Sequence, residues 1–273
     1  MKNYLIQCMV ITTLSISAIF AQAVSKTGTS AGQFLKIGVG SRAIGLGGAF
    51  TAIADDASSL YWNPSGIANN KTLSIFVDHY DWILDIEMDF IGFIIPLGSA
   101  GNLGVSTNYL HMGEMEVTST KNPEGTGEKF SAASYLGQIS YARNLTERFS
   151  LGSSIKLIKE SIWNSTATGI AIDIGTLYKS TFPGLKLGMS ISNYGSKMKM
   201  DGRDLLIQTD LDPSLESDPE NLNSNLMTDE FDLPMIFRFG MSYSKKLKNG
   251  FGTVLAIDAI HPSDNTESIN IGT

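Results

Sequence analysis

Past its first quarter the chain alternates apolar residues with small or polar ones at a period of two, over segments of ten or more residues. In residues 149–158, Phe149 and Leu151 lead one series while serine, glycine and lysine fill the other, and residues 169–178 and 235–244 repeat the pattern. A period of two is typical of β-strands whose faces lie in different environments. Strands this long favour a transmembrane barrel over a soluble sandwich, whose strands are usually shorter.

The sequence predicts ten such strands, joined by connections of two kinds. Short and long connections largely alternate, as they do when one rim of a membrane barrel faces the periplasm and the other the exterior. If the barrel starts on the periplasmic side, every short turn lies there. The short turns, rich in Gly, Asn and Pro, are 97–102, 144–148, 180–184 and 245–250, and the long loops are 113–129 and 196–233. The predicted strands are 72–79, 84–96, 103–112, 130–143, 149–162, 167–179, 185–195, 234–244, 251–261 and 267–273.

The first residues, 1–23, are predicted to be a secretory signal peptide. Lys2 precedes an apolar stretch that runs to Phe20, and Ala21-Gln22-Ala23 supplies a cleavage site. The alternative is a buried N-terminal helix. Cleavage removes Cys8, the one cysteine of the sequence, so the exported protein is stabilised without disulfides. Closure into a membrane barrel is one way to achieve this.

Composition narrows the class of protein. Charged residues make up 17%, glycine accounts for 27 of 273 residues, and the mean hydropathy is +0.04. These values argue against a disordered chain or a bundle of membrane helices, and they suit a barrel, in which alternation dilutes the apolar residues. No stretch of the sequence is basic enough to bind along the phosphate backbone of a nucleic acid, which argues against nucleic-acid binding. The acidity is local, because residues 201–232 hold ten acidic residues and one arginine, and this segment is predicted to be a mobile exterior loop.

Residues 24–71 break the strand pattern and are predicted to form a compact plug inside the barrel. Its glycines are expected to let backbone pack closely there. An acidic pair precedes a short helical run, where carboxylates accept backbone N–H groups, and an Asn-Pro pair is expected to end that helix. The residues singled out in this plug are Gly45, Gly47, Gly48, Asp55, Asp56, Asn63, Pro64 and Gly66.

Polar residues on the small-residue face of the strands are predicted to point into the lumen, where charges need water or a partner. Aromatic residues near strand ends are predicted to form girdles at the lipid–water interfaces, with ordinary strand-favouring aromatic content as the alternative. The lumen candidates are Asn108, Gln138, Lys156, Asp173, Arg238 and Asp258. The girdle candidates are Tyr80, Trp82, Tyr109, Tyr141, Trp163, Tyr178, Phe182 and Phe251.

Several motifs carry a family resemblance. They are Gly45-x-Gly47-Gly48-Ala49, Ala54-Asp55-Asp56-Ala57-Ser58, Asn63-Pro64-Ser65-Gly66, Phe34-Leu35, Tyr61-Trp62, Gly184-Leu185-Lys186-Leu187-Gly188 and the acidic insertion before Phe231-Asp232-Leu233-Pro234. With these motifs the chain resembles the PorV/PorQ branch of the FadL-type outer-membrane proteins. The resemblance covers residues 31–273 and is strongest in its first forty.

The resemblance implies an all-β, FadL-like transmembrane antiparallel barrel of about 14 strands with a glycine-rich N-terminal plug, in contact with outer-membrane lipid and lipopolysaccharide. Members of the PorV/PorQ branch serve the type IX secretion system, so the implied partners are secretion components or their cargo. FadL members instead pass long-chain fatty acids or other hydrophobic small molecules, which remains the alternative. A continuous apolar pocket between plug and wall would favour the transporter.

No pattern points to an enzyme or a cofactor. Gly38-x-Gly40-x-x-Ala43 fits part of a dinucleotide fingerprint, but the βαβ units that such a site needs do not follow. His79, His111 and His261 lie near predicted strand ends without metal-ligand spacing, so solvated rim positions are favoured over a metal site. The acidic run that starts at Asp210 lacks the spacing and central glycine of an EF-hand, which favours a solvated loop over a calcium site.

The last expectation concerns closure of the barrel. The tenth strand, 267–273, ends without the terminal aromatic residue common in such barrels, and the resemblance implies about four more strands. An open edge in lipid costs several kcal/mol for each unpaired backbone group. We therefore expect residues 72–273 to be part of a barrel that continues for roughly 50–90 residues. Strands 72–79 and 267–273 are expected to face each other across an unclosed gap.

Overall fold

The computed structural model describes residues 26–209, 222–246 and 251–273, so the predicted signal peptide lies outside the described residues. Ten long strands dominate the chain, and each matches one of the ten predicted segments to within a few residues. They are β1 Ser74–Asp81, β2 Ile86–Pro96, β3 Asn102–Met112, β6 Ala132–Asn144, β7 Phe149–Ile162, β8 Ser165–Lys179, β9 Leu185–Gly195, β15 Ile236–Lys246, β16 Gly252–Pro262 and β17 Ser268–Gly272.

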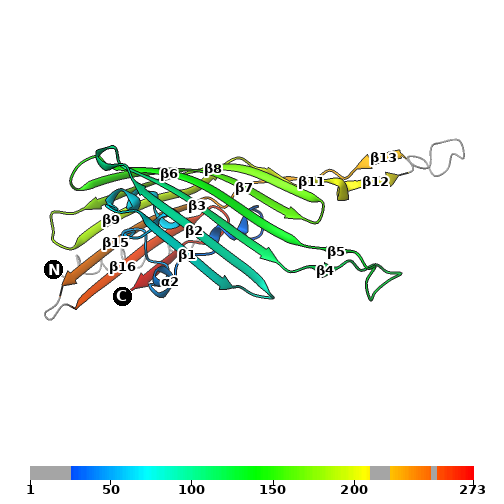
Figure 1. Ribbon diagram of the computed structural model, residues 1–273, viewed down its shortest axis with the longest axis horizontal. Coiled ribbons are helices and arrows are strands. Elements are labelled where there is room, and N and C mark those ends of the chain that lie inside the picture. Colours follow the sequence, from blue (N-terminus) through cyan, green and yellow to red (C-terminus); the bar gives the residue numbers. More distant parts are fainter. Residues whose placement is uncertain (1–25, 210–221, 247–250) are drawn as a thin grey trace, which may run out of the picture.

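The ten strands form one curved antiparallel sheet in which neighbours in sequence are neighbours in space (Figure 1). The ladders are regular except between β8 and β9, where the register shifts between Ile172 and Ile174. β1 and β17 are the two ends of the strand order, and no ladder joins them among the described residues. The described part is thus an open sheet, and its first and last strands are unpaired with each other as expected.

The two ends of the sheet differ. Strands are joined through residues 97–101, 145–148 and 180–184 at one end, which we name the short-turn rim. The chain at residues 113–131 and 196–235 leaves and re-enters the sheet at the opposite end, the long-connection rim. In Figure 1 the extensions of the long-connection rim project to the right, beyond the strand ends. The named short turns and long loops therefore lie at opposite rims as predicted, but the long-connection rim also has short connections at 82–85, 163–164 and 263–267.

The long connections contain small paired strands that the sequence analysis did not predict. β4 Met115–Glu116 pairs with β5 Lys129–Phe130, β12 Leu206–Thr209 with β13 Leu222–Asn225, β10 Met198–Lys199 with β14 Glu230–Phe231, and β11 Asp201–Gly202 with β8. The segment 201–232, predicted to be a mobile exterior loop, contains the short strands β11 to β14 in its described parts, and its mobility stays a prediction. Residues 210–221 lie outside the described residues.

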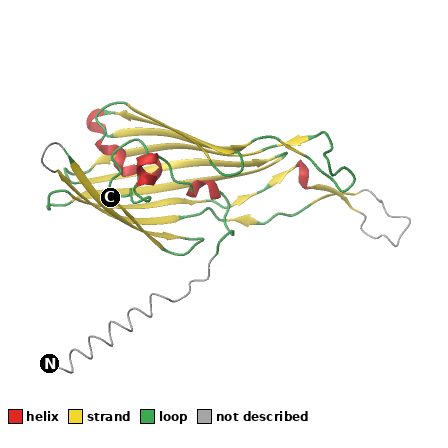
Figure 2. Ribbon diagram, turned by 90° about the horizontal axis from the view of Figure 1, so that it is seen from below, coloured by secondary structure: helices red, strands yellow, loops and turns green. Residues whose placement is uncertain are grey.

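The N-terminal segment, whose described part is residues 26–71, lies on the concave face of the sheet and runs from one rim to the other (Figure 2). Ser30 forms a parallel bridge with Asp232 at the long-connection rim, and Asn144 Nδ2 donates to the Ala68 carbonyl at the short-turn rim (3.1 Å). Buried apolar side chains of the segment and of β2 form the main core between them. The short helices are η1 Gln33–Lys36, α2 Ser41–Gly45, α3 Ser59–Trp62 and η2 Pro64–Asn69, with η3 Gly98–Ala100 and η4 Arg203–Leu205 in connections.

Burial on the sheet is the reverse of that in a soluble protein. In β7, Ser154 and Lys156 point toward the N-terminal segment and are buried, whereas Ile155 and Leu157 on the other face are 64% and 63% exposed. A soluble antiparallel sheet buries its apolar face and exposes the polar one. Within the described ranges, no helix is both long and apolar enough to cross a membrane.

Candidate functional site

The site is the contact between the N-terminal segment and the sheet, and Asn63 is its central residue. The Asn63 amide donates to the Thr51 carbonyl (2.8 Å) and to the Thr176 carbonyl of β8 (3.1 Å). Its side-chain oxygen accepts from the Ser65 backbone N–H (3.2 Å) and hydroxyl (2.7 Å). α3 ends at the residue before Asn63, as predicted, and Pro64 opens η2, where a missing N–H is tolerated. Asn63 therefore joins two turns of the segment to the sheet.

Tyr61 and Trp62 bind the backbone of the preceding part of the N-terminal segment through side-chain hydrogen bonds. Trp62 Nε1 donates to the Val39 carbonyl (2.8 Å), and Tyr61 Oη donates to the Leu35 carbonyl (3.1 Å). The two rings lie edge to face with centroids 4.9 Å apart. The guanidinium carbon of Arg238, on β15, lies 5.6 Å from the Trp62 ring centroid and 5.9 Å from that of Tyr61. Such a buried cation–π contact contributes about 2 kcal/mol.

Glycines in the strands make room for the backbone of the segment. At Gly152 of β7, a Cβ atom would lie 2.5 Å from the carbonyl carbon of Pro64 and from the nitrogen of Ser65, so no side chain fits there. At Gly188 of β9, a Cβ atom would collide with the backbone of Thr51. The sequence analysis missed both positions. The available signal was a glycine inside an otherwise regular strand, which marks close approach of another backbone.

Two of the predicted plug glycines pack closely against β17. Gly47 and Gly48 have φ angles of +63° and +77°, a region that favours glycine. A Cβ atom at Gly47 would lie 3.0 Å from the Ile271 carbonyl oxygen, and one at Gly48 would lie 2.9 Å from Asn270 Nδ2. Both positions therefore restrict the side chain by conformation and by space.

The space around the Cβ position differs between two other predicted plug glycines, Gly66 and Gly45. A Cβ atom at Gly66 would collide with the carbonyl oxygen of Ala54, inside the segment itself. No described atom lies within 4 Å of the Cβ position of Gly45. The prediction of close packing is wrong for Gly45, because it is an exposed residue at the end of α2.

The predicted acidic pair has two partners. Arg42 Nη1 donates to Asp55 Oδ1 (2.5 Å) and to Asp56 Oδ2 (3.1 Å), and its hydrogen bond with Asp55 raises the pKa of the guanidinium. Asp56 Oδ1 also accepts the Ser58 N–H (2.9 Å), just ahead of α3. The pair thus closes the turn between α2 and α3 rather than facing the sheet.

The structure places all six polar strand candidates on the face that meets the N-terminal segment, and none is more than 5% exposed. Gln138 Nε2 donates to the Leu60 carbonyl (2.8 Å), and Asp258 Oδ2 accepts the Thr51 N–H (2.9 Å). Both side-chain polar atoms of Asn108 are buried without a hydrogen-bond partner among the described residues. The six residues are Asn108, Gln138, Lys156, Asp173, Arg238 and Asp258.

Lys156 of β7 and Asp173 of β8 form a buried ion pair with an Nζ–Oδ2 distance of 2.6 Å. Asn193 completes it, since Lys156 Nζ donates to Asn193 Oδ1 (2.8 Å) and Asp173 Oδ1 accepts the Asn193 N–H (2.8 Å). Asn193 lies at the register shift of β8 and β9 with a φ angle of +63°. The sequence analysis missed it, because regular alternation gives no sign of a bulge and asparagine tolerates this conformation.

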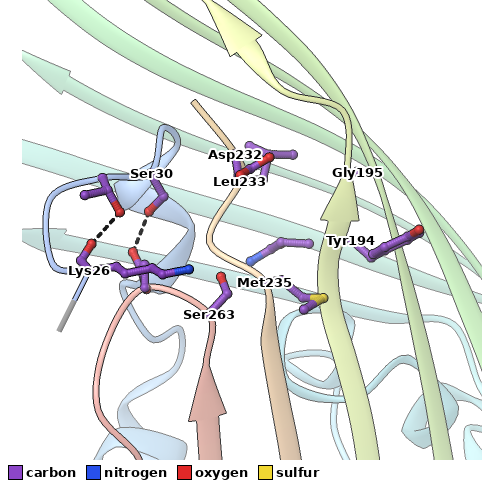
Figure 3. Close-up of a pocket in the computed structure, with 11 residues that line it drawn as sticks. Lys26, Ser30, Tyr194, Gly195, Asp232, Leu233, Met235 and Ser263 are labelled. Atoms are coloured by element: carbon purple, nitrogen blue, oxygen red, sulfur yellow. Dashed lines mark hydrogen bonds between the residues drawn. The ribbon is translucent and has the colours of Figure 1, made fainter. Parts of the chain in front are cut away.

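A cavity of about 250 Å³ opens beside this network at the long-connection rim (Figure 3). Its wall comes from the N-terminal segment, the end of β9 and the chain before β15 and after β16. Asp264 lies in that wall and fastens the segment, because its Oδ2 atom accepts from Ser30 Oγ (2.5 Å), Gln33 Nε2 (3.1 Å) and Lys36 Nζ (2.8 Å). The labelled residues in Figure 3 are Lys26, Ser30, Tyr194, Gly195, Asp232, Leu233, Met235 and Ser263.

The pKa of Asp264 reflects two opposing effects. Burial disfavours the charged carboxylate, but the hydrogen bonds from Lys36, Ser30 and Gln33 outweigh it and hold the pKa below its ordinary value. The carboxylate is therefore charged at neutral pH, and its ion pair with Lys36 joins the segment to the loop between β16 and β17.

A larger cavity, of about 540 Å³, lies between the N-terminal segment and strands β15 to β17. Its wall combines apolar side chains such as Ile44, Ile236 and Ile260 with the buried guanidinium of Arg238. The Nε atom of Arg238 has no hydrogen-bond partner in the described part of the chain. This cavity therefore pairs apolar side chains with two cationic residues, Arg238 and Lys36.

All three histidines lie at the long-connection rim, each beside a carboxylate. The nearest nitrogen–oxygen distances are 2.7 Å for His79 with Asp89, 3.5 Å for His111 with Glu87 and 3.0 Å for His261 with Glu267. Over the described ranges, no group of three or more His, Cys, Asp or Glu side chains is placed to hold a metal ion.

One girdle candidate is misplaced. Tyr80 was predicted to face lipid, but its hydroxyl donates to the Gly38 carbonyl (2.9 Å) on the concave face. The error arises because Tyr80 is one residue out of phase with the exposed side chains Val77 and His79 of the same strand. Trp82, Trp163 and the other candidates apart from Tyr109 are at least 39% exposed.

Comparisons with known proteins place the chain in a family. Two curated relatives, both described as UPF0164 protein of Treponema pallidum (strain Nichols), are 25% identical over 174 residues and 26% identical over 207 residues. These matches cover 59% and 69% of this chain but only 43% and 62% of the relatives, so the chain spans about half the length of the curated relatives it matches. The family described as type IX secretion system protein PorV matches residues 20–214, which confirms the PorV/PorQ resemblance. The chain belongs to this PorV family of type IX secretion system proteins.

Proposed function

We propose that the protein is a β-barrel component of the outer membrane whose exposed rim holds type IX secretion components or their cargo. Membership of the PorV family associates it with that system. The observation that carries the membrane part of the proposal is the inverted sheet, with polar side chains buried on the concave face and large apolar ones exposed on the other. A barrel wall in lipid requires this arrangement.

The cross-strand register supports a lipid-facing band. On the outer face, each row of side chains can be followed across six strands from β1 to β8. One row is Ile75, Phe93, Val105, Ile139, Ile155 and Ile172, and the next is Val77, Ile91, Thr107, Gly137, Leu157 and Ile170. The row beyond it, toward the long-connection rim, is His79, Asp89, Tyr109, Tyr135, Lys159 and Thr168.

This change from apolar to polar rows is what a lipid–water boundary demands. Tyr109 stacks on Tyr135 with ring centroids 4.6 Å apart, at the level where aromatic girdles lie in membrane barrels. The two apolar rows, which lie farther from the long-connection rim than this level, contain no charged residue. Outer-membrane lipid and lipopolysaccharide are therefore the proposed surroundings of the outer face.

The long-connection rim supplies the proposed partner surface. Its described extensions expose large apolar side chains that no sheet covers, and such patches mark protein contacts. They are Leu206 at 58%, Ile207 at 37%, Leu226 at 50%, Met227 at 91% and Phe231 at 45% exposed. The concave face, in contrast, is occupied by the N-terminal segment, which suits a scaffold better than an open channel. This role requires no enzymatic chemistry and no cofactor.

A second candidate function is passive transport of a hydrophobic small molecule, such as a long-chain fatty acid. The cavity of about 540 Å³ favours it, because apolar walls and the cation of Arg238 suit an amphipathic anion. The hydrogen bonds that hold the N-terminal segment in place oppose it, since a passing ligand has to displace that segment.

Cysteine labelling in intact cells tests the membrane topology. Met227→Cys lies on the long-connection rim, and Thr181→Cys lies in a short turn and serves as its matched control. The predicted cleavage of residues 1–23 removes the native Cys8, so each variant carries one thiol. A membrane-impermeant maleimide should label the cysteine at position 227 in intact cells, and the one at 181 only after the outer membrane is permeabilised. The reverse result would contradict the orientation, and recovery of the protein in the soluble periplasm after carbonate washing would contradict a membrane barrel.

Deletion of the gene tests the secretion role. Type IX cargo should then accumulate inside the cell and return to the surface when the wild-type gene is restored. Normal secretion combined with loss of long-chain fatty-acid uptake would instead support the transporter.

A further inference from the structure

The short-turn rim is basic, although the protein as a whole has a net charge of -7. Seven cationic side chains gather at the strand ends and in the connections of this rim. Glu147 is the acidic residue of the described short turns, while Asp55 and Asp56 are held by Arg42. The seven are Lys71, Arg143, Arg148, Lys179, Lys186, Lys245 and Lys246.

These cations lack ion-pair partners. At the long-connection rim, Lys36 pairs with Asp264 at 2.8 Å and Lys129 with Glu114 at 3.3 Å. None of the seven cations of the short-turn rim has a carboxylate within 4.0 Å in the described parts of the chain. Unpaired like charges repel one another, so their concentration on one rim favours an anionic partner.

A cavity of about 460 Å³ lies within this rim, where the N-terminal segment leaves the concave face. Lys71 and Lys179 are in its wall, together with the side-chain amides of four asparagines. Lys179 Nζ donates to Asn69 Oδ1 (2.8 Å), and Asn144 and Asn102 hold the Ala68 and Ile67 carbonyls, so the wall is fixed by hydrogen bonds. The four asparagines are Asn69, Asn70, Asn102 and Asn144.

We infer that the short-turn rim is a docking surface for an acidic polypeptide segment of a partner protein. The cations are spread over the N-terminal segment, the end of β6, the turn between β6 and β7, and strands β8, β9 and β15, which is too wide for one phosphate group. Alternation places Lys179, Lys186 and Lys246 on the concave face of their strands, whereas Arg143 and Lys245 are in phase with the outer face. An acidic chain that crosses the mouth can reach these lysines and the cavity together, whereas lipid headgroups lie against the outer face.

The inference rests on the proposed function only for the compartment that this rim faces, which is the periplasm in that orientation. Binding is therefore measured on the purified full chain in detergent micelles, where orientation in the membrane has no influence. The probe is a fluorescent synthetic peptide rich in glutamate, followed by anisotropy. Because the whole protein is acidic, general attraction of this peptide is disfavoured, and binding that weakens steeply with salt is expected.

The variant Lys71→Glu/Lys179→Glu should weaken peptide binding by about tenfold or more. The matched control is Lys121→Glu/Lys197→Glu, which makes the same charge change at exposed lysines of the long-connection extensions and should leave the affinity unchanged. Lys71→Gln/Lys179→Gln should give an intermediate loss, and unchanged circular dichroism of all variants shows that they fold. Both membrane labelling and fractionation are independent of this result, so failure here leaves the proposed function intact.

Three outcomes would overturn the inference. Equal loss in the control variant would show general electrostatics rather than a surface. Displacement of the peptide by inorganic phosphate at matched concentration would show a small-anion site. Binding of phosphatidylglycerol vesicles through the same two lysines, with no peptide binding, would show a lipid contact.

Discussion

The two rims of the sheet hold the same N-terminal segment by different chemistry. At the long-connection rim the buried carboxylate of Asp264 accepts three hydrogen bonds from the segment, one of them from the Lys36 ammonium at 2.8 Å. At the short-turn rim no carboxylate of the described residues makes these contacts: Asn102 Nδ2 donates to the Ile67 and Asn70 carbonyls at 2.5 and 2.8 Å, and Lys179 Nζ donates to Asn69 Oδ1 at 2.8 Å. One attachment therefore depends on a carboxylate that is protonated in acid, and the other does not.

The difference follows the proposed roles of the two rims. The long-connection rim carries the hairpins and most of the local acidity, and the segment is fastened there by charge. The short-turn rim is compact, and backbone of the segment there lies against a strand glycine, Gly152. Loosening of the segment should therefore begin at the long-connection rim, where fewer close backbone contacts support it.

The largest expected effect is at the buried ion pair between the rims. Lys156→Met leaves the Asp173 carboxylate buried without its partner, since both side chains are at most 4% exposed. Removing one member of such a pair costs about 3–5 kcal/mol of unfolding free energy. Urea unfolding of the purified protein in micelles measures it, and the segment should loosen first at the long-connection rim.

The double variant Lys156→Met/Asp173→Leu is the control for this pair. It also removes the Asp173 carboxylate, which the single variant leaves buried without a partner, so most of the lost stability should return. If the single variant were as stable as the wild type, the pair would be open to water and would not contribute to the attachment of the segment.

The next effect is at the short-turn rim. Gly152→Leu forces a side chain into the backbone of Pro64 and Ser65, and overpacking of this kind costs about 1–3 kcal/mol. Gly137→Leu is the matched control, because Gly137 is a strand glycine on the exposed outer face with no atom within 4 Å of its Cβ position. Protease sensitivity of residues 64–71 should rise in the first variant and remain unchanged in the second. Equal effects in both would mean that the segment does not press on this strand.

Much of the fold was predictable because a period of two depends on local sequence. Alternation located all ten long strands and put Lys156 and Arg238 on the buried face. The Asn63-Pro64 pair ended α3 as expected, since capping and proline effects are also local.

The remaining features depend on which segments meet in space. Gly152 is essential only because η2 lies against it, and Asn193 takes its conformation from a bulge that pairs with β8. Gly45 shows the converse error, since a glycine-rich motif does not reveal which of its members touches a neighbour. The hairpin of β12 and β13 was missed because the acidity of the whole segment suggested a mobile loop, whereas the residues that pair, 206–209 and 222–225, carry no charge.

The smallest expected effect is the pH response of the long-connection rim. The pKa of Asp264 is lower in the folded protein than its ordinary value of about 3.9. A group of this kind contributes stability that is present above the unfolded pKa and is lost as pH falls through the folded pKa. Between neutral pH and about pH 5 the contribution of Asp264 to the attachment should therefore not change, and below about pH 4 it should weaken.

Hydrogen exchange, corrected for the intrinsic rate at each pH, measures this response. The reporters at the long-connection rim are the Ala31 N–H, bonded to the Asp232 carbonyl at 3.0 Å, and the Leu35 N–H. The reporter at the short-turn rim is the N–H of Asn70, a residue whose carbonyl accepts a hydrogen bond from the Asn102 amide. Protection should fall at the first rim and persist at the second, and Asp264→Asn should remove the part of the difference that comes from Asp264, because the asparagine does not titrate. Equal loss at both rims would mean that acid unfolds the segment as one unit, and the two attachments would then be energetically inseparable.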